Sequence, residues 1–315
     1  MIDARQPAAT DRLHGALVEI LDRLAAEGYG FVTTTPSTHR RVASRLTRAR
    51  RGDLRDIFGW GRAFEPEDLE PNLLAAMRAA HIVVDDEGLL RSSVRVSSLD
   101  GRLHLHSARN DAPDAVFLGP DSYRFVRFLN ALMRDDGPCA AILDVGAGAG
   151  AGALALAARR PQARVVAGDV NRLALTFLTA NAAHARLAVE IVEGPGPQAV
   201  NGMFDLIVAN PPYVAGGDRR TYRDGGGPLG ADLALDWVEA GLGRLRTGGR
   251  FALYTGSPII EGRDLLRAEL ERLATGAGAS LAYEELDPDV FGGMLSQQAY
   301  SQVERIAAVG AVLTR

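Results

Sequence analysis

The sequence contains no lysine, and all 35 of its basic residues are arginine. Schiff-base chemistry and lysine general-base catalysis are therefore excluded, because both need an amine whose pKa can be lowered. The single cysteine, Cys139, excludes an internal disulfide and a cysteine-rich metal site, and its apolar neighbours predict a small buried hydrophobic residue. The formal net charge of −4 gives no general reason to expect a polyanionic partner.

Long apolar runs are also missing. No run approaches the ~20 residues that span a bilayer, and residues 1–15 contain no apolar segment of the signal-peptide kind. We therefore expect a cytoplasmic protein. With 315 residues, of which 47% are hydrophobic, the chain is long enough to bury a full core, and we expect one large domain and a smaller one.

The first part of the chain predicts two helices. One has an apolar face at Leu13, Leu17, Ile20, Leu21 and Leu24. The second begins at Ser37 and carries an arginine run that extends to Arg51, with Arg41, Arg45 and Arg48 on one face. This face suits phosphates or an acidic protein, and it is equally typical of a solvated helix surface.

Residues 81–110 change to an extended pattern, and Asp100-Gly101 predicts a hairpin turn. His104 and His106 lie on one side of this hairpin. Two histidines on one face can begin a metal site, but the neighbouring sequence offers no third ligand, so we expect no metal.

After a connector through "FLGPDSYRFVRFL", strands and helices alternate, which predicts right-handed crossovers and a parallel sheet covered by helices. The fold class is α/β: a Rossmann-like, seven-stranded, mostly parallel sheet whose last strand is antiparallel, preceded by a small α+β domain. We place these domains at residues 1–112 and 113–315. The expected strands are 141–145, 164–169, 187–192, 204–209, 250–255, 280–286 and 303–313, and the expected helices are 150–160, 171–184, 231–245 and 260–274.

A glycine turn follows the first strand of this sheet in "ILDVGAGAGAGALALAARR". Glycines at 146, 148 and 150 permit a tight turn and let a ligand approach the backbone. Asp169 ends the next strand, where its carboxylate can accept hydrogen bonds from the two ribose hydroxyls of an adenosine moiety. A purely structural turn from strand to helix is the alternative.

Two cofactor classes fit such a site, dinucleotides and S-adenosylmethionine. Asp144 precedes the first glycine, and a carboxylate there suits the ammonium of an amino-acid moiety better than a pyrophosphate, which prefers bare N–H groups. The sequence therefore favours a positively charged cofactor.

The stretch "FDLIVANPPYV" places a second site at the end of the fourth strand. The two prolines stop the strand and hold Asn210 extended at the edge of the sheet where ligands bind. The Asn210 side-chain oxygen and the Pro211 carbonyl can each accept one N–H of a nitrogen that attacks a methyl group, and both bonds strengthen as that nitrogen becomes positive. Tyr213 is expected to stack on a planar substrate. A rigid turn without chemistry is the alternative.

These residues resemble the class I S-adenosylmethionine-dependent methyltransferases that act on amino groups through an NPPY motif. The resemblance covers about residues 115–315 and is specific at "LDVGAGAG", "GDVNRLALTFLTANA" and "FDLIVANPPYV". It implies S-adenosylmethionine as cofactor, S-adenosylhomocysteine as product and chemistry at Asn210. The expected cofactor contacts are Asp144, Gly146, Ala147, Gly148, Gly150, Asp169, Val170, Asn171, Glu193 and Asn210.

The domain order, with a small N-terminal domain first, is similar to that of release-factor glutamine methyltransferases. Two features depart from that family. Pro195 stands near the position of the usual adenine contact, so either Glu193 replaces that contact or it is lost. The glycine-rich "TYRDGGGPLGAD", residues 221–232, also differs. Candidate substrate contacts are Tyr123, Pro212, Tyr222 and Arg223.

Three functions follow from these observations. The first is an N-methyltransferase that acts on a protein side-chain amide or a small nitrogenous metabolite. The second is a nucleic-acid base methyltransferase that uses the arginine-rich helix on phosphates. The third is an inactive cofactor-binding subunit, against which an intact Asn210 argues. Neither the methyl acceptor nor the oligomeric state can be read from the sequence.

Overall fold

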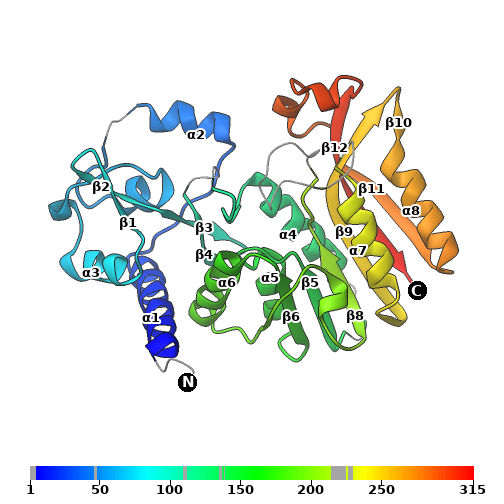
Figure 1. Ribbon diagram of the computed structural model, residues 1–315, viewed down its shortest axis with the longest axis horizontal. Coiled ribbons are helices and arrows are strands. Elements are labelled where there is room, and N and C mark those ends of the chain that lie inside the picture. The colour runs from blue at the N-terminus through cyan, green and yellow to red at the C-terminus, as the bar shows by residue number, and fades with distance from the viewer. Residues whose placement is uncertain are drawn as a thin grey trace.

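The computed structural model describes residues 5–45, 48–108, 112–134, 137, 139–213, 225 and 230–315 (Figure 1). Tyr222 and Arg223, two of the expected substrate contacts, lie outside these ranges.

A single large sheet organises the C-terminal two thirds of the chain. Its strand order is β11-β12-β9-β8-β5-β6-β7; the strands from β9 to β7 run parallel, and β12 is antiparallel to both of its neighbours. This confirms the predicted seven-stranded sheet with an antiparallel last strand; a two-residue β10 only extends the end of β9. The bounds are β5 Ala141–Val145, β6 Arg164–Asp169, β7 Glu190–Glu193, β8 Phe204–Ala209, β9 Leu245–Ile260, β10 Arg263–Asp264, β11 Ser280–Asp287 and β12 Arg305–Thr314.

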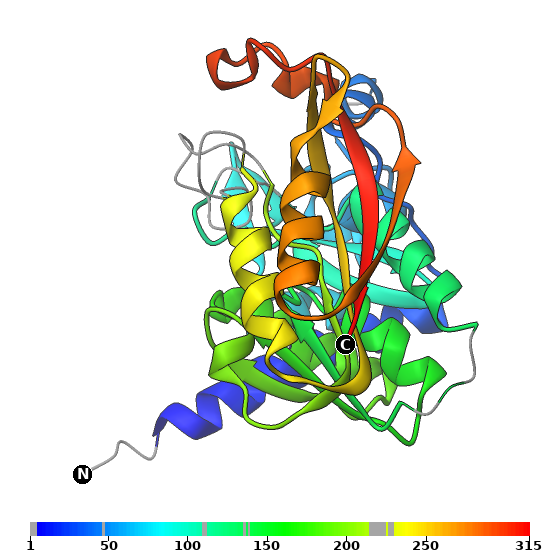
Figure 2. The ribbon, with the colours of Figure 1, turned by 90° about the vertical axis from the view of Figure 1, so that its right-hand side faces the viewer.

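Helices cover both faces of this sheet, as Figures 1 and 2 show. One face packs against α4 (Pro120–Leu132), α5 (Ala151–Arg159) and α6 (Arg172–Ala185), and the other against α7 (Asp232–Leu242) and α8 (Leu265–Gly276). The helix α4 occupies the segment that we expected to be a connector. Pro120 begins it at a position where no N–H is needed, and its buried residues Phe125 and Leu129 recur at helical spacing.

Among the described N-terminal residues there are three α-helices, α1 Arg5–Ala26, α2 Pro36–Ala43 and α3 Pro71–Ala79, and two hairpins, β1 Val83–Asp86 with β2 Leu89–Ser92 and β3 Val94–Leu99 with β4 Arg102–Ser107. The predicted apolar face of α1 is buried. The predicted turn is also confirmed, because Asp100 and Gly101 both have positive φ, +50° and +76°, as a tight hairpin requires.

The predicted arginine-rich helix is confirmed at its start and wrong in its extent. The helix α2 ends at Ala43, so Arg45 and Arg48 do not continue a common face with Arg41. Instead the chain turns back onto acidic neighbours: Arg48 Nη1 lies 2.8 Å from Glu65 Oε1, and Arg50 Nε lies 2.9 Å from an Asp56 carboxylate oxygen. These ion pairs neutralise two of the six arginines in the run, Arg48 and Arg50.

A buried asparagine joins the N-terminal elements to the sheet domain. Asn181 of α6 is 0% exposed; its Oδ1 accepts from Leu105 N at 2.8 Å, and its Nδ2 donates to Leu105 O at 3.3 Å and to Ala149 O at 2.9 Å. Residues of α1, α3 and β4 share one hydrophobic cluster with α6. The proposed boundary at residue 112 stays a prediction.

The cysteine and the two histidines singled out in the sequence lie at least partly within the core. Cys139 is only half-buried, although it packs against the core as expected of a hydrophobic residue. His104 and His106 are buried, His106 Nε2 lies 2.8 Å from Ser97 Oγ, and burial lowers the pKa of His104 to about 4. Within the described ranges, no three potential metal ligands come together, and no helix has the length and apolar character needed to cross a membrane.

Candidate active site

The strands β5 and β8 lie side by side and end together. Asp144 pairs with Val208 and Val145 with Ala209, so the glycine turn and Asn210 leave neighbouring strands at the same edge. The strand order reverses at this point, which is where ligands bind in open α/β sheets. A cavity of about 320 Å³ opens here and is lined by most of the predicted cofactor contacts, namely Asp144, Gly146, Ala147, Gly148, Asp169, Val170, Asn171 and Asn210.

The glycine turn is held by Asp169. Gly148 has a φ of +54° and no atom within 4 Å of the position of a Cβ, so the backbone here is open to a ligand. Its N–H donates to Asp169 Oδ2 at 2.8 Å, while Asp169 Oδ1 accepts from Asn171 N, also at 2.8 Å. Burial raises the pKa of Asp169. Each carboxylate oxygen keeps a lone pair, so the residue can shape the turn and still accept from ribose hydroxyls.

Asp144 is a buried carboxylate at the base of the cavity. It is 1% exposed, and its Oδ2 accepts from Ala153 N of α5 at 2.7 Å. Burial, with a smaller contribution from the Asp169 carboxylate, raises the pKa of Asp144 to about 7. Within the described ranges no cationic side chain pairs with it, so the cavity favours a ligand that brings a positive charge.

A second buried carboxylate, Asp121, organises the neighbourhood of Asn210. Asp121 lies in the first turn of α4, and its Oδ1 accepts from the Tyr254 hydroxyl at 2.8 Å while its Oδ2 accepts from the Tyr213 hydroxyl at 2.9 Å. The Asn210 side chain lies close to this carboxylate and favours its ionised form, which lowers the pKa of Asp121 against the larger effect of burial. A carboxylate can only accept, so Asn210 must turn its Nδ2 toward Asp121.

This orientation leaves the Asn210 Oδ1 without a partner. The atom is buried and accepts no hydrogen bond from the described part of the chain. Buried acceptors of this kind are rare and usually await a ligand or water. Since Asn210 lines the cavity, its Oδ1 is available to an N–H group that enters there.

Three predicted site residues have other partners in the structure. The Tyr213 ring packs against Phe291, with ring centroids 5.0 Å apart, so the residue supports Asp121 and does not line the cavity. The Tyr123 hydroxyl accepts from Thr33 N at 3.1 Å and also lies outside the cavity. The exposed Glu193 carboxylate pairs with Arg172 at 2.9 Å.

The remaining predicted residues are placed more simply. Pro212 lines the cavity, and the buried Pro211 stands between it and Asn210 in the chain. Gly150 begins α5 with a φ of +89° and lies outside the cavity lining. The Asn171 Oδ1 caps α6 by accepting from Leu173 N and Ala174 N. Asn171 therefore forms part of the cavity wall while its side-chain oxygen is used within the fold. Where an adenine contact was expected, Gly194 and Pro195 form the wall together with Trp237, whose Nε1 donates to Pro195 O at 3.0 Å.

Asp121 and Tyr254 were missed by the reasoning from sequence. The signal for Asp121 was available in part, because "GPDS" is a good helix start with proline and an acidic residue in its first turn. Nothing in the sequence connects it to Tyr254, which is 133 residues away.

Fold and site together define a Rossmann-like α/β domain with a nucleoside-type cavity at its switch point. Comparison with known proteins makes this more specific: residues 126–271 match the family model "Methyltransferase small domain". The solved structure of a putative transferase from Pyrococcus horikoshii has a similar fold, with a TM-score of 0.50, 13% identity, and coverage of 88% of this chain and 98% of that one.

Curated relatives point in the same direction. The chain is 45% identical over 114 residues to the release factor glutamine methyltransferase of Deinococcus radiodurans, covering 36% of this chain and 40% of that protein. It is 36% identical over 157 residues to the release factor glutamine methyltransferase of Moorella thermoacetica, covering 44% and 55%. The chain thus spans about half the length of the curated relatives it matches.

Proposed function

We propose that this protein is an S-adenosylmethionine-dependent N-methyltransferase that methylates the side-chain amide of a glutamine in a protein. The observation that carries the proposal is the unpartnered Asn210 Oδ1, buried beside a cavity that holds two carboxylates and a glycine turn. The relatives named above act on release factors by name, which supports a protein glutamine over a small metabolite.

The residues of the cavity fit this cofactor. Asp144 is buried without a cationic partner among the described residues, and it suits the ammonium of an amino-acid moiety. Asp169 offers two acceptor oxygens to a ribose, and Gly148 leaves the backbone open beside it. Val170 and Pro195 provide apolar surface for a flat base. The bound cofactor supplies an electrophilic methyl group on a sulfonium.

Asn210 is the residue that prepares the acceptor nitrogen. The lone pair of an amide nitrogen is delocalised into the carbonyl, so the nitrogen must be drawn toward tetrahedral geometry before it attacks. Asn210 Oδ1 accepts one N–H of the substrate amide, and this bond strengthens as the nitrogen gains positive charge. The Pro211 carbonyl is proposed to accept the second N–H. The substrate nitrogen loses its proton after transfer, so no base has to act before it.

Asp121 keeps Asn210 in the productive orientation. The carboxylate accepts from the Asn210 Nδ2, and a flipped amide would bring two oxygens together. The hydroxyls of Tyr213 and Tyr254 fix both carboxylate oxygens and so prevent Asp121 from turning away. These three residues position Asn210 without touching the substrate.

The test compares Asn210→Ala with the wild type on a bacterial release factor and labelled S-adenosylmethionine. Methyl transfer should fall by a factor of ~100 or more, while the affinity for S-adenosylhomocysteine, measured by calorimetry, should change little. Asn201→Ala, an exposed change just before the same strand, should leave both quantities unchanged. Persistent transfer by Asn210→Ala would refute the mechanism.

Label incorporation into cell extract tests the substrate class separately. We expect label in the protein fraction, and label in nucleic acid would favour the base methyltransferase. That alternative has lost its main support, because Arg48 and Arg50 are engaged by acidic neighbours.

A further inference from the structure

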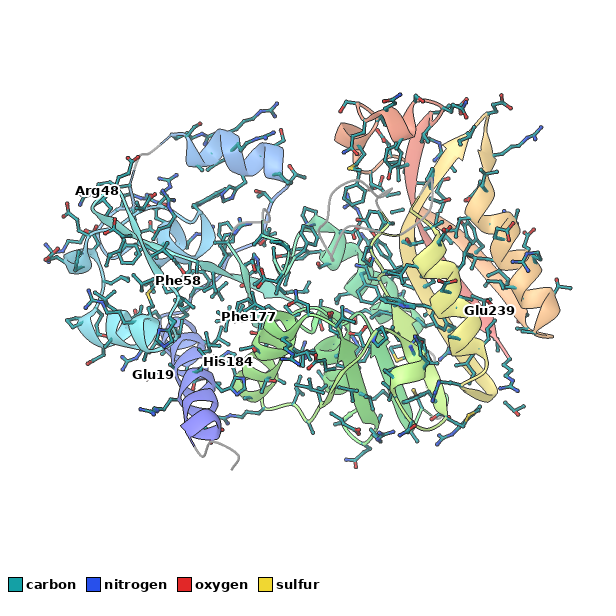
Figure 3. The ribbon with its side chains drawn as sticks, in the orientation of Figure 1. Glu19, Arg48, Phe58, Phe177, His184 and Glu239 are labelled. Carbon is teal, nitrogen blue, oxygen red and sulfur yellow. The ribbon has the colours of Figure 1, made fainter. Side chains whose placement is uncertain are left out.

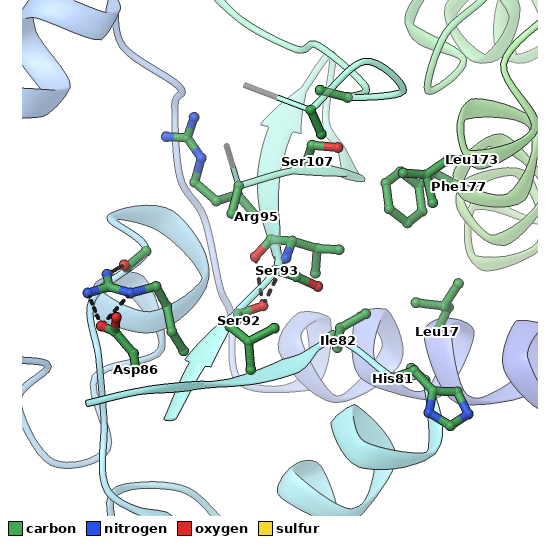
Figure 4. A pocket seen from close by; sticks show the side chains of 18 of the residues that line it. Leu17, His81, Ile82, Asp86, Ser92, Ser93, Arg95, Ser107, Leu173 and Phe177 are labelled. Atoms are coloured by element: carbon green, nitrogen blue, oxygen red, sulfur yellow. Dashed lines mark hydrogen bonds and ion pairs between the residues drawn. The ribbon is translucent and has the colours of Figure 1, made fainter. Parts of the chain in front are cut away.

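A second and larger cavity, of about 930 Å³, lies between the N-terminal elements and α6 (Figure 4). Figure 4 shows Leu17, Ile82, Leu173 and Phe177 on one side of it and Arg95 of β3 extending from the other. Among the described lining residues, only Ala115 is shared with the proposed active site. The cavity is therefore a separate space with an apolar wall and a cationic wall.

Arg95 is a buried cation without a counter-ion. It is 7% exposed, its Nη1 donates to His39 Nδ1 at 3.0 Å, and its Nε has no hydrogen-bond partner. No carboxylate forms an ion pair with it within the described ranges. His39 contributes no charge, because burial and the neighbouring Arg95 lower the pKa of His39 to about 4.

Arg62 is the second buried cation at this wall. It is 6% exposed, and its Nη2 donates to Val42 O at 3.2 Å. Its Nε is 3.6 Å from Asp56 Oδ1, too far for a hydrogen bond, and the Asp56 carboxylate is already bound by Arg50. The Nε and Nη1 of Arg62 therefore have no acceptor. Arg95 donates to His39 and Arg62 donates to Val42 O, and both acceptors belong to α2, so the two guanidinium groups lie at the same end of the cavity.

A third arginine at the cavity, Arg91, has its hydrogen-bond acceptors within the fold. Its guanidinium also lines the cavity, but it binds Asp86 Oδ2 through Nε at 2.9 Å and donates to Gly61 O. The deficit of negative charge is complete at Arg95, which forms no ion pair within the described ranges, and partial at Arg62, which shares the Asp56 carboxylate with Arg50. Burying a guanidinium without a counter-charge is unfavourable by several kcal/mol, so a ligand that supplies the missing acceptors would bind with a large gain.

We propose that this cavity binds a small molecule through an oxyanion, a carboxylate or phosphate group, at Arg62 and Arg95. The planar fork of arginine N–H donors matches the oxygens of such a group, and the apolar wall accepts an apolar body attached to it. A small molecule fits better than a nucleic acid, because the two guanidinium groups are more than nine-tenths buried and the exposed Asp85 and Asp114 at the cavity would repel a polyanion.

Calorimetry without any methyl-transfer cofactor tests the proposal. The probes are inorganic phosphate, phenyl phosphate and benzoate, with uncharged benzamide as control. The wild type should bind phenyl phosphate or benzoate, and the tighter of the two identifies the preferred oxyanion. Arg95→Met should weaken this binding by about 10- to 100-fold, the loss typical of hydrogen bonds to a charged group. Binding of benzamide as tight as that of benzoate would overturn the proposal, as would no binding of any anion.

Arg41→Met is the matched control. It removes one positive charge from α2, the helix that carries His39, at an exposed position outside the cavity. Arg41→Met should bind the probes like the wild type. If Arg41→Met and Arg95→Met lose equal affinity, the effect comes from the general positive charge of the protein and not from a site at Arg95. Arg62→Gln is the second variant and should also weaken the binding.

Thermal unfolding gives an independent readout. In buffer without anions, Arg95→Met should raise the midpoint of unfolding, because it removes an uncompensated buried charge. Added phenyl phosphate or benzoate should raise the midpoint of the wild type and not that of the variant. A lower midpoint for Arg95→Met without ligand would mean that the charge is already balanced within the fold, and the proposal would fail.

Discussion

Replacing Asp121 by asparagine is the sharpest test of how the active site is held. The carboxylate accepts from the Tyr254 and Tyr213 hydroxyls at 2.8 and 2.9 Å, and the Asn210 amide lies beside it and favours its ionised form. A carboxylate has two acceptor oxygens, whereas a carboxamide has one oxygen and one NH2 donor. In Asp121→Asn, a neighbouring donor that faced a carboxylate oxygen would therefore face the new NH2 group. Asn210 can resolve this conflict by flipping, which turns its Nδ2 to the cavity and removes the acceptor for the substrate N–H.

The size of the effect on kcat follows from the hydrogen bond that makes one orientation of the Asn210 amide more stable than the flipped one. A hydrogen bond to a charged group contributes ~1.5–3 kcal/mol, which favours the productive orientation by roughly 10- to 100-fold. With a neutral partner this preference disappears. We therefore expect kcat for methyl transfer to fall by about 10- to 100-fold, while the dissociation constant for S-adenosylhomocysteine changes by less than about threefold.

The pH dependence distinguishes positioning from mere support of the fold. Burial raises the pKa of Asp121, so acidification protonates it in the folded protein at a higher pH than an ordinary carboxyl group. A protonated Asp121 resembles asparagine. The kcat of the wild type should fall as the pH drops through this raised pKa, and the profile of Asp121→Asn should lack that limb.

Asp205→Asn is the matched control. Asp205 lies on β8, the strand that ends at Asn210, and its carboxylate binds Ala140 N, Ala141 N and Arg246 at the opposite edge of the sheet. This variant should lose stability without losing kcat per folded molecule. If Asp121→Asn keeps kcat within about threefold of the wild type, or loses cofactor affinity in parallel, the positioning role is wrong.

Three further predictions concern the buried polar residues. The pKa of Asp144 is raised to about 7, so its contribution to stability is full below pH ~4 and is lost as the pH rises through 7. Between pH 5 and pH 8, the free energy of unfolding measured in urea should therefore fall by about 2–3 kcal/mol more for the wild type than for Asp144→Asn. Equal losses in the two proteins would contradict the assignment. Asp169→Ala should weaken S-adenosylhomocysteine binding at least about tenfold by calorimetry, and unchanged affinity would place the ribose contact elsewhere. Asn181→Ala should lower the free energy of unfolding by about 2–4 kcal/mol, because it leaves buried backbone groups of Leu105 unpaired, and a change below 1 kcal/mol would show that water replaces the amide.

Much of the sheet domain could be predicted because its signals are local. The predicted strand 204–209 matches β8. A short apolar run that two prolines end is typical of a buried strand, so this prediction needed no information from distant residues. The neighbouring positions of Asp144 and Asn210 followed from the parallel order of such sheets.

The failures occurred where partners distant in the chain decide the outcome. The arginine run was predicted as one helix from local spacing, but ion pairs to Glu65 and Asp56 hold the chain in another path. Tyr213 packs its ring against Phe291 and donates its hydroxyl to Asp121, contacts that local sequence did not indicate, and its stacking on substrate stays a prediction.

The groups available for chemistry follow from local backbone rules: a glycine turn, two acidic residues near strand ends and an asparagine fixed by prolines. The orientation and the charge of those groups depend on the packing of the whole fold. Asp121 turns Asn210 toward the cavity, and burial raises the pKa of Asp144 and leaves Arg95 without a counter-ion. The reason is physical: hydrogen-bond direction and desolvation depend on which distant segments pack together, and local sequence does not specify that packing.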